Sequence, residues 1–366
     1  MALAAGAVWL ACLIVANCVE IDAPQRPTEA WARARIARDP LDLTAVRALG
    51  LALNRRGRTD AAERFLSFVA TQTWRDIPTL VWLVPRRIRQ GDFVNATADA
   101  DALMRQNIDD RLREPLIKTM IAAAGDDGAR PALVTRLEAR PWWRESFLPR
   151  LGVAGDIQGA RAVLRALAKG RAPASDAEYA PLINRLVETG AYDDALDDRT
   201  ALSGRPKAVN EPLRNGDFAA PADPTAFGWS SAVGVGGQSA VEAAPDAHGE
   251  MALRVDYDGF STPALPRQLL VLRPGRYRLG WREWRSRDSP RRIDWTVHCA
   301  DTGAVVAQDV STYSGSGWVG RTLTIAVPIG GCRGQWLVLA PSPGERRDPA
   351  TVWYTGFRLN HPLRVD

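Results

Sequence analysis

Histidine, cysteine and lysine are scarce in this chain of 366 residues, which holds three histidines, four cysteines and three lysines. The cysteines form no CxxC pair and no cluster with histidine, so the sequence predicts no metal site. The GxSxG, HExxH and P-loop motifs of common enzymes are also absent. His298 and Cys299 are neighbours, but adjacent residues of a strand face opposite sides and cannot form a nucleophile and its base. No cofactor is predicted.

Because lysine is so rare, arginine supplies all but three of the 47 basic residues, and the net charge is +5. A basic stripe would indicate binding to nucleic acid. Most of the arginines instead alternate with aspartate and glutamate, as in residues 105–113, which is typical of a solvated helix face. The sequence therefore predicts no nucleic-acid partner.

Residues 1–19 carry no charged side chain, and a helix of that length nearly spans the roughly 30 Å hydrocarbon core of a bilayer. Residues 1–22 are predicted to be a signal segment or a membrane anchor, either cleaved or retained. A terminal helix docked into the rest of the protein is the alternative. Arginines follow this run and none precedes it, which by the positive-inside rule would keep the protein in the cytoplasm.

Two distal cysteines favour export instead. Cys299 and Cys332 are separated by 32 residues, and each lies in or beside a predicted strand. We expect a disulfide, which persists only in an oxidising compartment and would add roughly 3 to 4 kcal/mol of stability. Two buried free thiols are the alternative. The predicted location is the periplasm, with a tether in the inner membrane.

The length exceeds that of one hydrophobic core, which stops growing near roughly 250 to 300 residues. Helical periodicity fills residues 28–202, and residues 203–214 hold two prolines and a glycine, as expected of a linker. Short alternating runs fill residues 215–361. The predicted fold is a helical array followed by an antiparallel β-sandwich.

A repeat of about 34 residues runs through the helical half. Tight-turn glycines are followed five residues later by alanines, and the pairs are Gly57 and Ala62, Gly91 and Ala96, Gly155 and Ala160, and Gly190 and Ala195. Each glycine would close a helix in the left-handed conformation, and each alanine would let the next helix pack closely. The spacings are 34, 64 and 35 residues, and the long one leaves room for a degenerate copy at residues 125–137.

The first copy has Leu49 and Gly50 before its turn and Leu66 and Val69 after its alanine. In these positions residues 40–202 resemble the tetratricopeptide repeat family. The resemblance implies an α-solenoid of stacked hairpins that binds a protein partner or serves as a rigid spacer. Later copies depart from the family with larger residues where a small one is usual: Val84, Leu148 and Ile183. Four tryptophans of this half are predicted to pack in the core: Trp74, Trp82, Trp142 and Trp143.

Eight strands are predicted in the second half, at residues 251–257, 268–272, 276–284, 293–299, 304–310, 321–327, 335–340 and 352–359. Residues 273–276, Arg-Pro-Gly-Arg, predict a type II turn that joins two strands as a hairpin. In the next strand Arg282 and Trp284 alternate with Leu279 and Trp281. One face of this strand is therefore core, and the other carries polar and aromatic groups.

Residues 215–218, Asn-Gly-Asp-Phe, are followed by Trp229. This segment resembles the opening strand of carbohydrate-binding modules with the galactose-binding-like jelly-roll fold. The turn at residues 272–277 and the last strand, at residues 352–359, fit the same pattern. The resemblance covers residues 215–361 and implies a sandwich that binds a saccharide.

Sugar recognition needs an aromatic platform with planar polar groups beside it. The first candidate constellation is Trp284 with Arg282, Asp294 and His298, and the second is Trp318 with Tyr313 in a loop rich in glycine and serine. An arginine that merely covers an exposed ring is the alternative for Trp284. Four other tryptophans are predicted to lie in the core: Trp281, Trp295, Trp336 and Trp353.

Glu283 and Asp294 are the strongest catalytic candidates, because glycosidases use paired carboxylates. Strand alternation places them on opposite faces, which weakens the case for a glycosidase or lyase. Residues 234–237, Gly-Val-Gly-Gly, lack the third glycine of a dinucleotide loop and predict a turn. We expect a non-catalytic envelope protein that binds a polysaccharide, in its assembly or export. A purely structural protein-interaction module is the alternative.

Overall fold

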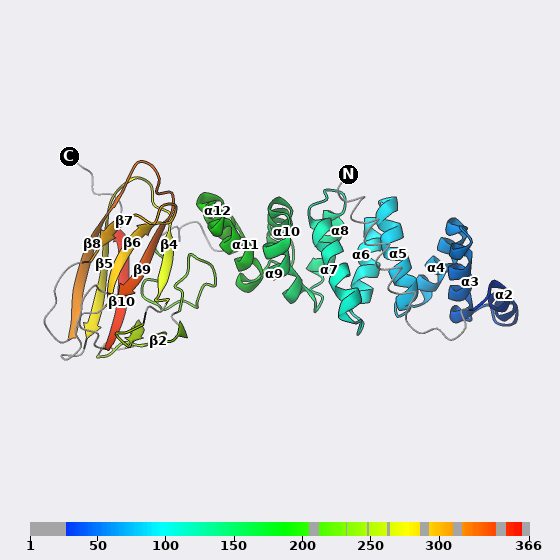
Figure 1. The fold of residues 1–366 in the computed structure, drawn as a ribbon, viewed down its shortest axis with the longest axis horizontal. Coiled ribbons are helices and arrows are strands. Elements are labelled where there is room, and N and C mark those ends of the chain that lie inside the picture. The colour runs from blue at the N-terminus through cyan, green and yellow to red at the C-terminus, as the bar shows by residue number, and fades with distance from the viewer. Residues whose placement is uncertain are drawn as a thin grey trace. The chain divides into compact units, whose positions relative to one another are not determined.

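The computed structural model of the protein describes residues 27–204, 212–231, 233–246, 249–261, 264–285, 293–309, 317–341 and 349–360. The predicted segment at residues 1–22 and the candidate Tyr313 lie outside these ranges. Helices come first along the chain and two antiparallel sheets follow (Figure 1). The chain divides into two compact units, with unit 1 ending at Ala174 and unit 2 beginning at Ser175. In the described ranges, we find no helix with the length and apolar character that a bilayer crossing requires.

In the described residues 27–204, helix α2 (Glu29–Arg38) is followed by five helical hairpins. Unit 1 holds α3 (Leu43–Arg55) with α4 (Thr59–Gln72), α5 (Ile77–Gln90) with α6 (Phe93–Met104), α7 (Asp110–Ala124) with α8 (Arg130–Glu138), and α9 (Arg144–Ala154) with α10 (Ile157–Lys169). Unit 2 begins with α11 (Asp176–Glu188) and α12 (Tyr192–Leu202). The first helices of successive hairpins begin 34, 33, 34 and 32 residues apart, in agreement with the predicted period. Membership of the tetratricopeptide family stays a prediction.

Aspartate side chains start half of the hairpin helices. In each case the carboxylate accepts a hydrogen bond from a backbone N–H in the first turn, which would otherwise be unsatisfied. The negative charge is also favoured at the positive end of the helix dipole. These N-cap residues are Asp42, Asp76, Asp92, Asp109 and Asp156. Local chemistry therefore marks the start of three of the five hairpins, at α3, α5 and α7, and the start of the second helix in two.

The turn glycines behave as predicted in three of four hairpins. Gly57, Gly91 and Gly190 have positive φ angles of 74° to 76°. Gly155 instead has φ −74°, and a Cβ at this position would lie 2.6 Å from the carbonyl oxygen of Leu151. Close packing, not a left-handed backbone, is thus the reason for glycine there. The four paired alanines are all buried, as expected.

The prediction that the helical tryptophans lie in the core is wrong for two of them. Trp143 is fully buried, and its Nε1 donates a hydrogen bond of 2.9 Å to the buried carboxylate of Asp101. Trp82 packs against the core from a half-buried position. Trp74 and Trp142 are 50% and 59% exposed. Trp142 and Trp143 lie in the turn before α9, and only Trp143 points into the core there.

Unit 2 contains two antiparallel sheets. The six-stranded sheet has the order β1-β2-β3-β10-β5-β8, and the four-stranded sheet has the order β4-β9-β6-β7. The strands are β1 (Val233–Gly234), β2 (Gly237–Ala243), β3 (Met251–Tyr257), β4 (Arg267–Leu270), β5 (Gly275–Arg285), β6 (Ile293–Cys299), β7 (Val305–Gln308), β8 (Gly317–Val327), β9 (Gln335–Pro341) and β10 (Ala350–Asn360). The eight predicted strands all exist. β1 and β2 were missed, because β1 has only two residues and β2 consists mainly of small or polar residues that are exposed or half-buried.

Two local predictions are wrong. The turn at residues 273–276 does not close a hairpin, because β4 before it and β5 after it belong to different sheets. Gly275 has a φ of 152°, well away from the roughly 80° of a type II turn. The motif at residues 215–218 is a turn and not an opening strand. Its Gly216 lies so close to the bulge of β10 that a Cβ would come within 2.1 Å of the oxygen of Phe357.

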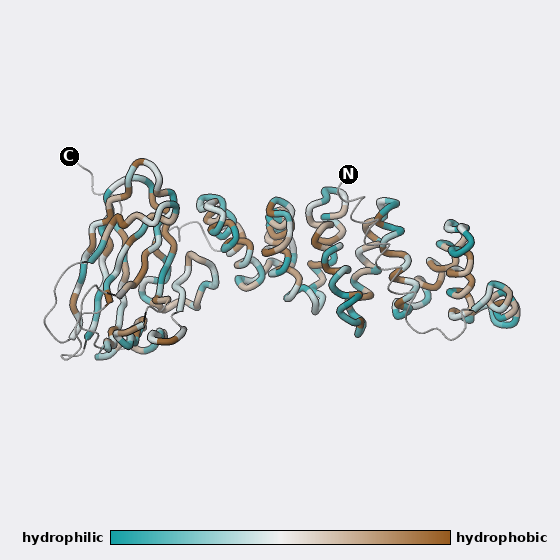
Figure 2. Tube along the Cα trace, in the orientation of Figure 1, coloured by the Kyte–Doolittle hydropathy of each residue, from teal (hydrophilic) through white to brown (hydrophobic). Residues whose placement is uncertain are grey.

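Aromatic rings dominate the core between the sheets. Along the strands in Figure 2, hydrophobic and hydrophilic residues alternate. Phe357 turns inward at the bulge of β10, where its ring centroid lies 5.0 Å from Trp229, 5.1 Å from Trp295 and 6.1 Å from Trp281. Burying side chains of this size is the largest favourable contribution to the stability of the sandwich. Trp281 and Trp295 are therefore core residues, as predicted.

The last helical hairpin is packed into the same unit as the sandwich. Buried Arg199 on α12 forms an ion pair with Asp223, in the segment that leads to the sheets. Asn184 on α11 accepts a hydrogen bond of 2.8 Å from the N–H of Ala226. The aromatic ring of Tyr192 lies against Gly334, where a Cβ would come within 3.0 Å of it. Unit 2 is thus a sandwich with a helical hairpin attached by polar and aromatic contacts. The predicted domain limits stay predictions.

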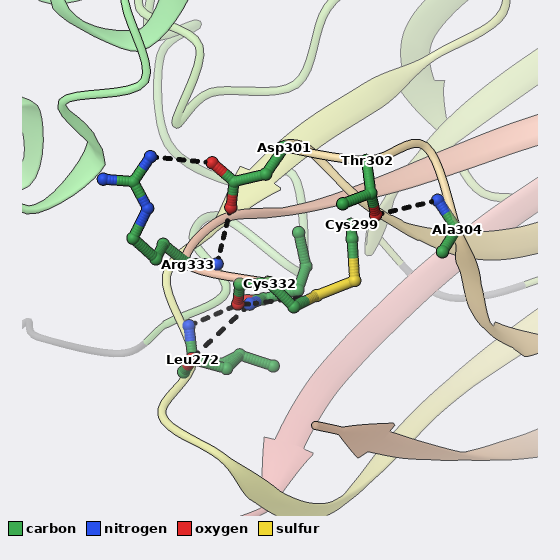
Figure 3. Close-up of a disulfide and its surroundings, with 8 residues drawn as sticks. Leu272, Cys299, Asp301, Thr302, Ala304, Cys332 and Arg333 are labelled. Carbon is green, nitrogen blue, oxygen red and sulfur yellow. Dashed lines mark hydrogen bonds and ion pairs between the residues drawn. A yellow bond between two sulfur atoms is a disulfide. The ribbon is translucent and has the colours of Figure 1, made fainter. Parts of the chain in front are cut away.

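A disulfide joins Cys299 at the end of β6 to Cys332, just before β9 (Figure 3). This prediction is confirmed. Beside the bond, Arg333 donates hydrogen bonds of 2.8 and 2.9 Å to the carboxylate of Asp301. The buried amide of Gln335 hydrogen-bonds both Leu272 and the carbonyl oxygen of Cys332. The bond therefore ties together two loops that are also held by polar contacts.

We expect the double substitution Cys299→Ser and Cys332→Ser to destabilise unit 2 by about 3 to 4 kcal/mol, because the unfolded chain gains the freedom of the open loop. Hydrogen exchange measures this as a lower opening free energy in β6 and β9. The amides of α3 and α4, in unit 1, are the internal control and should not change. Reductant should lower the wild-type value and leave the variant unaffected. Equal protection in wild type and variant would refute a stabilising role.

Candidate functional site

Alternation along β5 decides which of its side chains face solvent. Trp281, Glu283 and Arg285 are buried on the inner side, while Arg282 and Trp284 are half-buried on the outer side. This parity agrees with the prediction from the sequence. The outer face of the six-stranded sheet therefore carries an aromatic ring next to a guanidinium group.

Three tryptophans form one row across this outer face. Trp284 on β5 is the direct cross-strand partner of Trp318 on β8 and of Trp353 on β10. Directly opposed residues of antiparallel strands point to the same face. The row continues with Arg254 on β3, which is the partner of Trp353. At the usual strand spacing, the three indole groups span roughly 10 Å. We call Trp318, Trp284 and Trp353 the tryptophan row.

The rings of the row are held at defined angles. Trp284 and Trp353 meet edge to face at 88°, with centroids 4.9 Å apart. The Nε1 of Trp353 donates a hydrogen bond of 2.8 Å to Glu242 on β2. The Nε1 of Trp318 donates one of 2.7 Å to the carbonyl oxygen of Pro245. With both indole N–H groups satisfied, these two rings keep fixed positions while all three stay half-buried.

Charged groups surround the row in pairs. The guanidinium of Arg282 lies 5.3 Å from the ring centroid of Trp318 and forms an ion pair with Glu250. The guanidinium of Arg254 lies 5.4 Å from the ring of Trp353 and donates a hydrogen bond of 3.2 Å to Asp256. Each arginine therefore stacks on a ring and keeps its charge compensated.

The structure does not bring the first predicted constellation together. Asp294 and His298 lie on β6, where they alternate with the inward-facing Trp295 and Val297, so they face the outside of the four-stranded sheet. Arg282 and Trp284 face the outside of the other sheet. The grouping was wrong because Asp294 and His298 belong to a strand of the second sheet. Of the second constellation, Trp318 joins the row instead, and Tyr313 lies outside the described residues.

Two tryptophans that were assigned to the core are not there. Trp353 is half-buried in the row, and the alternation of Val352 and Tyr354 toward the interior could have revealed this. Trp336 is half-buried on the outer face of the four-stranded sheet, opposite His298, with the guanidinium of Arg267 4.4 Å from its ring centroid.

The proposed catalytic carboxylates do not share a cleft. Glu283 faces the interior, where its carboxylate accepts hydrogen bonds of 2.9 and 3.0 Å from Arg321. Arg285 lies 3.5 Å from the same oxygen. Asp294 lies in the four-stranded sheet, on the face that points away from the core and from Glu283. Within the described ranges, no three histidine, cysteine, aspartate or glutamate side chains are grouped to hold a metal ion.

Comparison with known proteins gives no family assignment. No protein-family model matches the chain, and no curated protein matches it. Similar solved structures include a CBM22-1 xylan-binding domain from Paenibacillus barcinonensis, at 16% identity and a TM-score of 0.30, where the match covers 39% of this chain and 90% of that one. A putative sugar binding protein from Bacteroides thetaiotaomicron has 13% identity and a TM-score of 0.30, over 41% of this chain and 99% of that one.

A Stig cyclase, Fisc from Fischerella sp. TAU, is also similar, at 17% identity and a TM-score of 0.32, over 41% of this chain and 95% of that one. Two of these three proteins are thus described as binding proteins and one as a cyclase. Likenesses at this level assign no function to the present chain. The function has to be inferred from the geometry of the tryptophan row and its surroundings.

We expect Trp353→Ala to cost less stability than Trp295→Ala, because only the second opens a cavity in the core. Large aromatic to alanine changes in a core cost about 3 to 5 kcal/mol, whereas an outer aromatic pair contributes about 0.5 to 1.5 kcal/mol beyond its burial. Hydrogen exchange of β5 and β10 in each variant measures the two losses. Equal losses would contradict the outer position of Trp353.

Proposed function

We propose that the sandwich is a non-catalytic saccharide-binding domain whose platform is the tryptophan row. The observation that carries the proposal is the direct cross-strand pairing of Trp318, Trp284 and Trp353 on one solvent-facing side of the sheet. Large aromatic groups are normally placed in cores or at binding sites. The core of this domain already contains its own buried aromatic residues. Three further tryptophans in one row on the outer face are therefore better explained by binding than by folding.

The chemistry of the row suits sugars. An indole face packs against the C–H groups of a pyranose ring, and the planar groups of Arg254, Arg282 and Glu242 beside the rings can hydrogen-bond hydroxyls. Because the rings of Trp284 and Trp353 meet at 88°, they form an angled surface and not a planar one. An angled surface fits a single soluble polysaccharide chain better than the flat surface of a crystalline polysaccharide.

The two carboxylates that the sequence singled out for catalysis give no support to a glycosidase or lyase. Glu283 is tied to Arg321 inside the domain, and Asp294 lies in the other sheet. Neither carboxylate therefore lies beside the tryptophan row.

We further propose that the helical hairpins of unit 1 hold a protein partner in the cell envelope, as part of polysaccharide assembly or export. Exposed aromatic side chains support this, because such groups are enriched in protein interfaces: Trp31, Phe68, Trp74 and Trp142. The disulfide is consistent with a periplasmic or extracellular location. A purely structural role for both units is the competing proposal.

The binding proposal predicts that Trp284→Ala and Trp353→Ala each weaken saccharide binding at least tenfold, since stacking on an aromatic ring is lost. A glycan array identifies ligands of the wild-type chain, and titration calorimetry then compares the variants. Trp336→Ala is the matched control, because Trp336 is also half-buried and covered by an arginine, but on the other sheet. Absence of binding to every arrayed glycan would favour the purely structural role.

For the location, we expect a C-terminal fusion to alkaline phosphatase to be active, because this enzyme needs an oxidising compartment to form its disulfides. A reporter that works only in the cytoplasm is the matched control and should stay inactive at the same position. The reverse pattern would place the sandwich in the cytoplasm.

A further inference from the structure

A groove of about 530 Å³ opens beside the tryptophan row. Its polar lining includes Gln238 on β2, Asp256 on β3 and Thr351 on β10, which are direct cross-strand partners. On β3 and β10 these residues lie two positions from Arg254 and Trp353, so they share the outer face of the row. The distance along the strands is roughly 7 Å.

Asp256 is the centre of the hydrogen bonds in this groove. Its carboxylate accepts bonds of 2.8 Å from Thr351 Oγ1, 3.1 Å from Gln238 Nε2 and 3.2 Å from Arg254 Nε. A carboxylate offers about four lone-pair positions. The three donors among the described residues therefore leave acceptor capacity on this carboxylate for a ligand, together with the amide oxygen of Gln238 and the hydroxyl of Thr351. Alternating donors and acceptors of this kind match the hydroxyl groups of a sugar.

The far wall of the groove is a glycine-rich hairpin turn. Residues 234–237, predicted to be a turn, connect β1 to β2. Gly236 has a φ of 91°, and a Cβ there would lie 2.2 Å from the Cβ of Ser261. The backbone N–H of Asp258 donates a hydrogen bond of 2.9 Å to the carbonyl oxygen of Gly236. The carboxylate of Asp258 accepts hydrogen bonds from the backbone N–H groups of Phe260 and Ser261. The wall is thus fixed by a close approach of two turns and needs no ligand to form.

The charged side chains described at this face disfavour anionic ligands. Asp256 and Asp258 line the groove, and Glu242 and Glu250 lie beside the row. Arg254 and Arg282, the two cations that stack on the row, are already paired with Asp256, Glu242 and Glu250. Among the described residues of this face, a uronate or phosphate group would therefore meet more carboxylates than unpaired cations, which favours an uncharged ligand.

We infer that this groove is a second subsite for an uncharged saccharide chain, and that it holds the sugars that extend beyond the tryptophan row. The inference rests on the proposed function of the row. Arg254 joins the two subsites, because its guanidinium stacks on Trp353 and hydrogen-bonds Asp256. The row supplies stacking to one part of the chain, and the groove supplies hydrogen bonds to the hydroxyls of the next sugars. Affinity should then grow with chain length.

The test measures dissociation constants of the full chain for neutral oligosaccharides of two to six units, with cello-, xylo-, manno- and N-acetylchito-oligomers as probes. For the oligomer type that binds, we expect the hexamer to bind about tenfold more tightly than the trimer. Asp256→Asn should remove this gain and leave the trimer unchanged, since one hydrogen bond to a charged group is worth about tenfold. Hexagalacturonate should bind at least tenfold more weakly than the neutral hexamer.

Because Asp256→Asn also breaks a contact to Arg254, Gln238→Ala is the second variant, as Gln238 is exposed and less important for folding. Thr351→Val is the third groove variant, with the same expected loss for the hexamer alone, and Thr324→Val, on the outer face of β8 away from the groove, is its matched control. Equal affinity of wild type for trimer and hexamer would refute the second subsite alone. So would groove variants that weaken both oligomers equally. Failure of wild type to bind any oligomer would refute the proposed function as well.

Discussion

Strand β5 pairs with β8 on one edge and with β10 on the other, and its register with both fixes the two faces of the larger sheet. Because side chains alternate along a strand, a slip of one residue would exchange the faces completely. The present register places Trp281 and Glu283 inside and Trp284 outside. It also places Trp318 and Trp353 directly beside Trp284. The core and the candidate site therefore depend on the same backbone hydrogen bonds.

The same residue type has two roles in this domain, and its position along the strand decides between them. Trp281 and Trp295 lose nearly all contact with water and form the aromatic core around Phe357. Trp284 and Trp353 stay half-buried and meet edge to face on the outer side. A folding argument explains the first pair, because burial of apolar area stabilises the domain. The second pair is only partly buried, so its placement is better explained by binding.

The polar groups follow a similar division. Inside the sandwich, Glu283 is bound by Arg321, and breaking such a buried pair leaves an uncompensated charge at high cost. On the outer face, the ion pairs of Arg254 and Arg282 are partly solvated and contribute little to stability. Those outer groups are thus within reach of the hydroxyl groups of a ligand while they keep their ion pairs, whereas Glu283 is not. This difference places the candidate site on the surface row and its groove.

The sequence by itself determined the period of the helical hairpins and most strands, because these depend on local spacing and residue type. It also predicted the disulfide, with two free thiols as the alternative. It also determined that Arg282 and Trp284 share a face, since alternation along one strand is a local property. Only the tertiary structure decided which strands are neighbours. That decision separated Asp294 and His298 from Trp284, brought Trp318 and Trp353 to it, and joined Gln238, Asp256 and Thr351 in one groove. Cross-strand partners in the described strands lie up to 101 positions apart in the chain, between Leu253 and Tyr354, and no local pattern encodes which distant strand completes a sheet.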